Sequence, residues 1–374
     1  MGAATLFILV LALISLALSY QALSRDTPLE WRFVVEDLTK SRAKPKFEQV
    51  FDYAPTTGQA HSPAILVNEQ DFQIVWFEGS AEAQADVDIW GVRAAKKGKG
   101  WDLSEPAPVI TRDALGKAME PQQLVVTLGN TVQNEAVPNH AYATVVSLGG
   151  WAAASVADVA LGENGAVTQA RKLNLSPLLN RSHLVKSPMV AYADGTHALP
   201  AYFEMGATYG TLVRLGEDGR VRDARRMTGE DVKPIQPMIV PLSAERAVAF
   251  LRDFDPSGKL LISRTEDGGQ SWSAVESTDV PNPSAPVAAL LLSDGRILIA
   301  MNDDAARSNS LSLALSDDEG ASWSVIHTLE DEGGDARYPM LRRLPDGQIV
   351  LTYSHGSKKG VRAFVFNEPW VMAQ

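Results

Sequence analysis

The chain lacks cysteine entirely, and this absence removes several kinds of chemistry. With no cysteine among 374 residues, disulfides, zinc–thiolate sites and thiol nucleophiles are excluded. A basic excess is also missing, because 34 lysines and arginines stand against 45 aspartates and glutamates, which gives a net charge of −11. Nucleic acid and anionic lipid surfaces are therefore poor candidates for partners.

Motifs for metal, phosphate and serine-nucleophile chemistry are missing as well. The six histidines show no close ligand spacing, and no EF-hand loop is present. The sequence has no Gly-x-Ser-x-Gly elbow and no glycine-rich phosphate loop. We therefore expect neither a metal nor a cofactor.

A long helical period is absent after residue 24, and short β-type runs take its place. Runs of Val, Ile, Leu and aromatic residues, such as 73–77, 247–251 and 348–353, are separated by Gly, Asp and Asn. Asp-Gly pairs at 194–195, 218–219, 294–295 and 346–347 lie between such runs and favour hairpin turns. The pattern predicts an all-β protein.

The N-terminus has the one long apolar run. Residues 3–19 carry no charge, a length that fits a short membrane span or a long signal sequence. Ala22 and Ser24 suit a signal peptidase, but no Lys or Arg precedes the run. We expect residues 1–24 to be a signal peptide or a membrane anchor, 25–46 a polar tether and 47–374 the folded domain. The protein is then extracytoplasmic, periplasmic or secreted, and touches a membrane only through this segment.

Two segments share one pattern. Residues 265–272 (TEDGGQSW) and 316–323 (SDDEGASW) both read Ser/Thr-x-Asp-x-Gly-x-Ser-Trp, the Asp box. Asp267 and Asp318 can accept hydrogen bonds from turn N–H groups, glycine allows a positive φ, and tryptophan packs across the hairpin. We expect both aspartates to be structural, and the repetition predicts an architecture of repeated units.

Six proline-associated segments extend the repeat. Each is followed by a strand, a turn and a second strand. The prolines lie 46 to 67 residues apart, which leaves room for the 40–50 residues that one propeller blade needs. The predicted openings are His61-Ser62-Pro63, Glu120-Pro121, Lys186-Ser187-Pro188, Gln236-Pro237, Asn282-Pro283 and Arg337-Tyr338-Pro339. We predict a six-bladed β-propeller with four-stranded antiparallel blades, preceded by an N-terminal hydrophobic helix. Residues 47–53 (FEQVFDY) would supply the outer strand of the last blade and close the ring.

On these motifs the sequence resembles the sialidase (neuraminidase) superfamily, in particular bacterial predicted neuraminidases with BNR Asp-box repeats. The resemblance covers roughly residues 47–370 and includes WFEG, ADVDIWGVR, GGW, LPAYFE and RYPMLRRLPDGQIVLTY. It implies a Tyr nucleophile assisted by Glu, an Asp acid/base and three arginines on a substrate carboxylate. Tyr338 matches the nucleophile by position, and Asp86 or Asp88 matches the acid/base.

The same resemblance exposes departures from the family pattern. His61 stands in the Arg-x-Pro position of the first arginine, and Asn302 replaces the second arginine. Asn282 and its neighbours replace the glutamate expected at the fifth opening. Histidine and asparagine cannot form the bidentate fork that a carboxylate prefers, so hydrolysis of sialic acid itself is weakened as a prediction.

Polar residues at strand ends complete the predicted site at one mouth of the central channel. The catalytic candidates are Tyr338, Asp86, Asp88 and Glu204. The substrate-binding candidates are His61, His183, Lys186, Arg252, Asn302, Arg307, Arg337 and His355, and Glu78 and Asp253 also end strand runs.

Three functions fit this set. The first is an exported sialidase-like glycoside hydrolase acting on a glycan, with sialic acid or another acidic sugar as the candidate substrate. The second is a non-catalytic carbohydrate-binding propeller. The third is a polysaccharide lyase in which Tyr338 pairs with His61, His183 or His355 to abstract a proton from a uronic acid.

Overall fold

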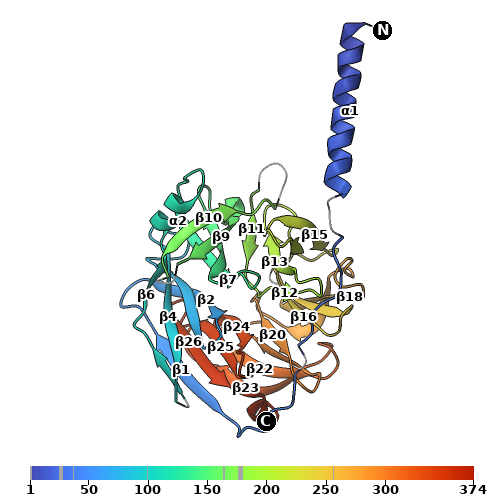
Figure 1. The fold of residues 1–374 in the computed structure, drawn as a ribbon. Coiled ribbons are helices and arrows are strands. Elements are labelled where there is room, and N and C mark those ends of the chain that lie inside the picture. Colours follow the sequence, from blue (N-terminus) through green and yellow to red (C-terminus); the bar gives the residue numbers. More distant parts are fainter. Residues whose placement is uncertain are drawn as a thin grey trace.

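Six antiparallel sheets arranged in a ring form the body of the protein in a computed structural model (Figure 1). The structure describes residues 2–24, 28–36, 38–98, 100–162, 165–175, 180–255 and 257–374. Each sheet is one propeller blade, and its innermost strand lines the central channel. The predicted six-bladed β-propeller is confirmed.

Blades 1 and 2 come from the first half of the chain. Blade 1 orders its strands β2 (Gln59–Val67), β3 (Asp71–Gly79), β4 (Asp88–Lys97) and β5 (Gly100–Leu103), with β6 (Ala107–Ile110) also paired to β4. The short helix α2 (Arg112–Ala118) follows. Blade 2 contains β7 (Thr127–Gln133), β8 (His140–Val146), β9 (Ser155–Leu161) and β10 (Val167–Lys172), with the 3₁₀ turn η1 (Trp151–Ala153) between β8 and β9.

Blades 3 to 5 follow in order around the ring. Blade 3 has β11 (His183–Val185) and β12 (Val190–Ala191) on β13 (His197–Phe203), then β14 (Tyr209–Leu215) and β15 (Val221–Met227). Blade 4 has β16 (Pro234–Pro241), β17 (Ala247–Asp253), β18 (Lys259–Thr265) and β19 (Glu276–Pro281). Blade 5 has β20 (Ala288–Leu291), β21 (Ile297–Met301), β22 (Leu311–Ser316) and β23 (Ser324–Glu330).

Blade 6 joins the two ends of the propeller. It combines β24 (Arg337–Arg343), β25 (Ile349–His355) and β26 (Gly360–Phe366) with β1 (Phe47–Tyr53), and the helix α3 (Glu368–Val371) ends the chain. β1 pairs antiparallel with β26 from Phe47 opposite Phe366 to Tyr53 opposite Val361. The predicted closure by residues 47–53 is therefore confirmed.

Three of the predicted proline openings share one backbone device. The ladders between the first and second strands of blades 1, 4 and 6 are interrupted at residues 62–63, 236–237 and 338–339. Ser62, Gln236 and Tyr338, each directly before proline, have φ of 52°, 51° and 58°. Such bulges turn a side chain out of the regular strand alternation, which is how these strands present residues to the channel mouth.

The other openings differ from the sequence prediction. Glu120-Pro121 does not open a blade, because the innermost strand of blade 2 is β7 and the dipeptide lies between α2 and β7. Pro188 lies between β11 and β12, and Pro283 lies between β19 and β20. The spacing identified the number of blades, whereas it misplaced one inner strand.

Both Asp boxes form the predicted side-chain lock in the turn after the third strand of their blade. Asp267 Oδ1 accepts from the Ser271 N–H at 2.9 Å, and Asp318 Oδ1 accepts from the Ser322 N–H at 2.8 Å. The Ser322 hydroxyl, together with the Ser322 N–H and the Ser316 hydroxyl, lowers the pKa of Asp318 to about 2. Trp323 packs edge-on against Phe250 of the neighbouring blade, with ring centroids 5.5 Å apart.

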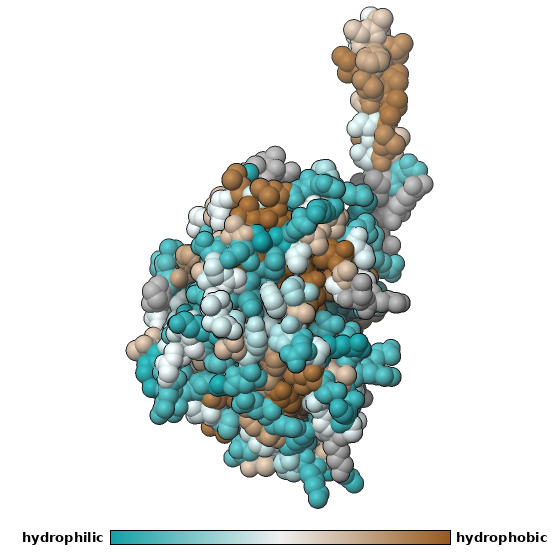
Figure 2. Space-filling model, turned by 90° about the vertical axis from the view of Figure 1, so that its left-hand side faces the viewer, coloured by the Kyte–Doolittle hydropathy of each residue, from teal (hydrophilic) through white to brown (hydrophobic). Residues whose placement is uncertain are grey.

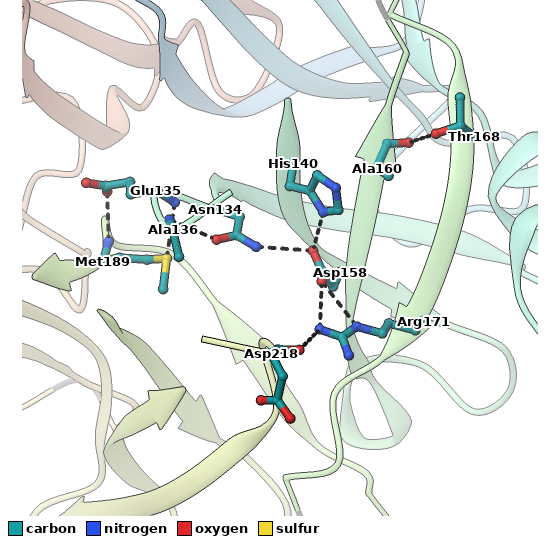
Figure 3. Close-up of polar contacts among 10 residues, drawn as sticks. All are labelled: Asn134, Glu135, Ala136, His140, Asp158, Ala160, Thr168, Arg171, Met189 and Asp218. Atoms are coloured by element: carbon teal, nitrogen blue, oxygen red, sulfur yellow. Dashed lines mark hydrogen bonds and ion pairs between the residues drawn. The ribbon is translucent and has the colours of Figure 1, made fainter. Parts of the chain in front are cut away.

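A polar network joins blade 2 to blade 3 (Figure 3). The buried carboxylate of Asp158 accepts from Asn134 Nδ2 at 3.3 Å, lies 3.1 Å from His140 Nδ1 and pairs with the Arg171 guanidinium at 3.3 Å. Arg171 Nη2 also donates to the Asp218 carbonyl of blade 3 at 3.2 Å. With its partners supplied by side chains, Asp158 is a structural link between blades.

The N-terminal helix α1 (Ala3–Ser24) projects away from the ring (Figure 1). Residues Ala3–Gln21 have a mean hydropathy of 2.4, long and apolar enough to cross a membrane, and none of them is buried. In Figure 2 the helix is a brown column beside a mixed, mostly polar propeller surface. The side chains of residues 22–24, including the proposed cleavage-site residues Ala22 and Ser24, and all of residues 25–27 of the predicted tether lie outside the described residues.

Removing an Asp-box carboxylate is expected to destabilise the propeller. Asp267→Ala and Asp318→Ala each remove hydrogen bonds to a turn N–H and a serine hydroxyl, and each should lower the free energy of unfolding by about 1–2 kcal/mol. Chemical denaturation of each variant measures this. Asp317→Ala, at an exposed neighbouring position, is the matched control, and an equal loss in the control would contradict the assignment.

Candidate functional site

The bulge in β24 places Tyr338 at the mouth of the central channel. A small cleft of about 50 Å³ opens there, and its walls come from blades 1, 2, 3, 4 and 6. The lining residues are Phe77, Glu82, Asn130, Trp151, Leu184, Tyr202, Glu204, Gln236 and Tyr338. A non-glycine residue held at positive φ is strained by about 1–3 kcal/mol, and such strain is common where function fixes a side chain.

Arg252, near the end of β17, organises the centre of the site. Its Nη1 donates to the Tyr338 hydroxyl at 3.3 Å and to Gln236 Oε1 at 3.3 Å, and its Nε donates to Ser284 Oγ at 3.0 Å. Gln236 Nε2 in turn donates to the Tyr202 hydroxyl at 3.2 Å. Arg252 is thus fixed by side chains of blades 4 and 5 while it contacts the tyrosine of blade 6.

Two carboxylates, Glu82 and Glu204, share the cleft with Tyr338. Burial raises the pKa of Glu204, and the negative charge of Glu82 raises it further, although Arg252 opposes the shift. Glu82 lies in the loop after β3 and forms an ion pair with Lys358. Glu204 is therefore the better proton donor, because its environment disfavours the charged form.

His61 lies beside Tyr338, with ring centroids 4.6 Å apart at 67°. It is 2% exposed, and its Nδ1 has no hydrogen-bond partner among the described residues. Burial, together with Lys358, Arg337 and other nearby cations, lowers its pKa well below the usual range. His61 is therefore neutral at pH 7 and cannot replace an arginine as a positive charge.

Lys186 crosses the floor of the site from blade 3 to blade 6. Its Nζ donates to the Pro339 carbonyl at 2.8 Å and lies 6.0 Å from the centroid of the Tyr338 ring. Burial lowers the pKa of Lys186 to about 7. Because the bonded carbonyl belongs to the residue after Tyr338, this lysine braces the strained bulge.

Arg337 completes the cationic side of the mouth. Its Nη2 donates to the Pro283 carbonyl at 3.3 Å and also to the Ser284 carbonyl. Burial and the neighbouring Arg252 lower its pKa. The structure therefore brings together six of the sequence-predicted residues, namely His61, Lys186, Glu204, Arg252, Arg337 and Tyr338.

Asp86 and Asp88, the two aspartates suggested as acid/base, have partners elsewhere. Asp86 accepts from the Ser80 N–H at 3.1 Å and from Ser80 Oγ at 3.0 Å, which holds its own loop. Asp88 accepts from the Arg112 N–H at 2.8 Å and Nε at 3.0 Å at the start of α2. Neither residue lines the cleft, where Glu82 of the same loop is found instead.

Asn302 and Arg307 also belong to local structure. Asn302 Nδ2 donates to the carbonyls of Ser308, Ser310 and Ala336 at 3.1, 2.6 and 2.9 Å, so it holds the loop after β21. Arg307 is half exposed in that loop, and its Nε donates to Asp304 at 2.7 Å.

The histidines of blades 3 and 6 lie apart from the cleft lining. His183 is buried against Phe203, with ring centroids 5.3 Å apart, and faces away from its neighbour Leu184 because strand side chains alternate. His355 Nε2 lies 3.2 Å from Asp52 Oδ1, next to the closing strand β1. Both are more simply explained as parts of their blades than as ligands.

Three further polar candidates are structural by their contacts. Glu78 accepts from the Tyr53 hydroxyl at 3.1 Å and from Trp76 Nε1 at 2.8 Å, between the closing strand and blade 1. Asp253 accepts from the Lys233 N–H at 3.1 Å. Asn282 Oδ1 accepts from the Ala285 N–H at 2.7 Å and so stabilises the turn before β20.

Sequence reasoning missed Glu82 and Gln236 as members of the site. Gln236 stands directly before the proline of its blade, in the position that Tyr338 holds in blade 6. Glu82 precedes Asp86 by four residues in one loop, and only the loop's conformation decides which carboxylate enters the cleft. Among the residues that the structure describes, no group of three or more His, Asp or Glu could hold a metal ion.

Lys186 makes stability depend on pH in a defined direction. An unfolded lysine titrates near pH 10.4, so between about pH 7 and 10 the unfolded chain binds more protons than the folded one. The free energy of unfolding of the wild type should therefore rise with pH in this window, relative to Lys186→Met, by up to about 1.4 kcal/mol per pH unit. Denaturation curves from pH 6.5 to 9.5 measure it. Lys259→Met, a surface control, should show no such difference, and parallel profiles for wild type and Lys186→Met would contradict the assignment.

The fold and its repeats match known proteins. The model of the BNR repeat-like domain matches residues 70–351. Among solved structures, a protein of unknown function from Dyadobacter fermentans superposes with a TM-score of 0.65 at 14% identity, over 86% of this chain and 99% of its own. The search of curated proteins finds no match.

Sialidases superpose almost as well. The Hadza microbial sialidase gives a TM-score of 0.64 at 12% identity, over 83% of this chain and 65% of its own. The Trypanosoma rangeli sialidase gives 0.62 at 10% identity, over 88% and 61%. The chain thus spans less than two thirds of the length of either sialidase, and at these identities the likeness concerns the fold. Because the family model covers residues 70–351, most of the six blades, the chain belongs to the BNR repeat-like domain family.

Proposed function

We propose that this protein is an exported glycoside hydrolase of the sialidase type, acting on a glycan that carries an acidic sugar. The observation that carries the proposal is the position of the Tyr338 hydroxyl, 3.3 Å from the Arg252 guanidinium, in a cleft that also holds Glu82 and Glu204. A nucleophile, a cation and a proton donor are the three parts such a reaction needs.

In this proposal Tyr338 attacks the anomeric carbon and passes its phenolic proton to the Glu82 carboxylate of the same cleft, while Arg252 binds the adjacent carboxylate of the sugar. A phenol suits a carbon that bears a carboxylate, because a neutral nucleophile avoids the repulsion that a second carboxylate would meet. Glu204 protonates the leaving oxygen, which its raised pKa favours. Water then releases the sugar, with Glu204 acting as the base, and Glu82 returns its proton to the Tyr338 oxygen.

Trp151 gives the cleft a sugar-binding wall. Its ring lies against Gly129, where a Cβ would come within 2.8 Å of the indole, so the glycine allows the ring to pack there. Trp151 lines the same cleft as Tyr338 and is partly exposed. An aromatic face stacks well on the apolar face of a pyranose.

The site also differs from the family pattern in ways that bear on the substrate. His61, in the position of the first arginine, is neutral, and Asn302, in the position of the second, donates to backbone carbonyls around its own loop. One exposed guanidinium fork holds a carboxylate less tightly than three. We therefore propose an acidic sugar other than a tightly held sialic acid as the preferred substrate.

Loss of the Tyr338 hydroxyl is expected to abolish turnover. Tyr338→Phe should lower kcat at least about 10³-fold on any glycoside that the wild type cleaves, because the substitution removes the attacking oxygen. Tyr142→Phe is the matched control, since the buried Tyr142 hydroxyl has no hydrogen-bond partner within the described part of the chain. Release of reducing sugar from an acidic glycan panel measures both, and full activity of Tyr338→Phe would exclude the proposed nucleophile.

Glu204 is expected to act through the leaving group. Glu204→Gln should slow cleavage of natural glycosides by about 10²–10⁴-fold. It should also flatten the fall in activity at high pH, because in the wild type that fall reflects deprotonation of Glu204, whose pKa is raised. Aryl glycosides with good leaving groups should be affected much less. Glu230→Gln, at an exposed position, is the control and should leave both rates unchanged. An equal loss on both substrate types for Glu204→Gln would assign Glu204 to binding.

A polysaccharide lyase is a second candidate, favoured by one observation. His61 is neutral and lies 4.6 Å, centroid to centroid, from Tyr338, an arrangement that could accept the α-proton of a uronic acid. Product analysis separates the two reactions, because elimination leaves an unsaturated sugar whereas hydrolysis leaves a saturated one with oxygen from water.

A further inference from the structure

We propose that residues 28–36, here called the strap, latch the propeller to α1 so that the catalytic mouth is held away from the membrane. The inference rests on α1 as a retained anchor in the exported protein. It concerns the orientation of the propeller relative to the membrane, and its test does not depend on the reaction proposed at Tyr338.

The strap is a built part of the propeller. Phe33 is 3% exposed and packs on Tyr192 with ring centroids 4.9 Å apart. The Phe33 N–H donates to the Ala244 carbonyl at 2.7 Å, and the Val34 N–H donates to the Ala191 carbonyl at 2.9 Å. The strap therefore connects blades 3 and 4 through backbone bonds, in a segment whose composition suggested a tether.

A buried arginine depends on the strap. The Arg214 side chain is fully buried, and its Nη2 pairs with Asp194 at 3.0 Å. Its Nη1 donates to the Glu30 carbonyl at 3.1 Å, and its guanidinium lies between the rings of Tyr192 and Trp31, at 3.5 and 4.9 Å. Without the strap the Arg214 guanidinium would lose a hydrogen bond and its contact with the Trp31 ring. Arg214 of blade 3 is therefore stabilised in its buried position by the strap.

The first Asp box is also fitted to the strap. A Cβ on Gly268 would lie 1.8 Å from the Trp31 carbonyl oxygen, an impossible contact. The second Asp box has Glu319 at the same position, and no strap crosses it among the described residues. The glycine difference between two otherwise matching repeats thus marks where the strap docks.

The strap lies on the face of the propeller opposite the mouth. It binds Ala244, in the turn before β17 begins at Ala247, whereas Arg252 lies near the other end of that strand. Seven strand residues span about 20 Å, close to the thickness of a blade. The bound strap and the cleft therefore lie on opposite faces at blade 4.

The chain between α1 and the strap is short. From Ser24, the last residue of α1, to Trp31 there are seven residues, which reach at most about 25 Å. An anchored α1 therefore keeps the strap face at blades 3 and 4 near the bilayer, and Figure 1 shows α1 leaving beside β15 and β18 of these blades. The channel mouth then faces away from the bilayer that holds α1, toward glycans on that side.

Single-cysteine labelling tests this directly, because the chain has no cysteine of its own. Full-length Gln270→Cys, in the Asp box beside the strap, and Ala305→Cys, in the loop after β21 on the mouth side, place a donor dye on exposed positions. Each is reconstituted in phosphatidylcholine vesicles that contain an acceptor-labelled lipid. We expect energy transfer from position 270 to exceed that from position 305 several-fold.

Gly268→Glu supplies the second measurement. It copies the other Asp box and should displace the strap, so the difference between positions 270 and 305 should shrink while glycosidase activity is kept. Equal or reversed transfer in the otherwise unmodified protein would overturn the proposal, as would an intact mass from the expressing cell that lacks residues 1–24. Loss of activity in Tyr338→Phe leaves these readings unchanged, which separates orientation from the proposed reaction.

Discussion

The pairing of β1 with β26 is the constraint on which the rest of the structure depends. It joins residues 47–53 to residues 360–366 and converts a row of six sheets into a closed ring. Closure leaves only short edges and points every inner strand at one channel. The bulges at Ser62, Gln236 and Tyr338 then converge, although they lie up to 276 residues apart in sequence. The site is thus a consequence of ring closure as much as of its own residues.

Much of the fold could be predicted from the sequence, because its signals are local. The Asp boxes are hydrogen-bonded within eight residues, and the closing strand FEQVFDY mixes half-buried apolar residues with exposed polar ones, as an outer strand does. Glu120-Pro121 led to a wrong prediction of an inner strand. A proline marks the start of a strand only when the residues after it pair with a neighbouring strand, and in blade 2 the inner strand starts at Thr127. The role of residues 28–36 was hidden too, since Trp31 and Phe33 become meaningful only when blade 3 supplies Arg214 and Tyr192.

The sequence predicted some residues of the site and missed others, and the difference has a physical basis. Tyr338, Arg252, Glu204, Lys186, Arg337 and His61 converge because they occupy repeated positions on inner strands or at strand ends. Asp86 and Glu82 occupy a loop, where the sequence does not reveal which carboxylate binds Ser80 and which enters the cleft. The role of Lys186 also needs three dimensions, because its partner Pro339 lies three blades away.

The central claim is that Tyr338 forms the covalent bond of a glycosidase reaction. The most direct measurement is mass spectrometry of the full-length protein after incubation with a 2,3-difluorinated acidic sugar, in which fluorine slows release of a glycosyl–enzyme. The account predicts a single adduct that maps to the peptide containing Tyr338. An adduct on another residue, or none under conditions in which the protein cleaves glycosides, would contradict it.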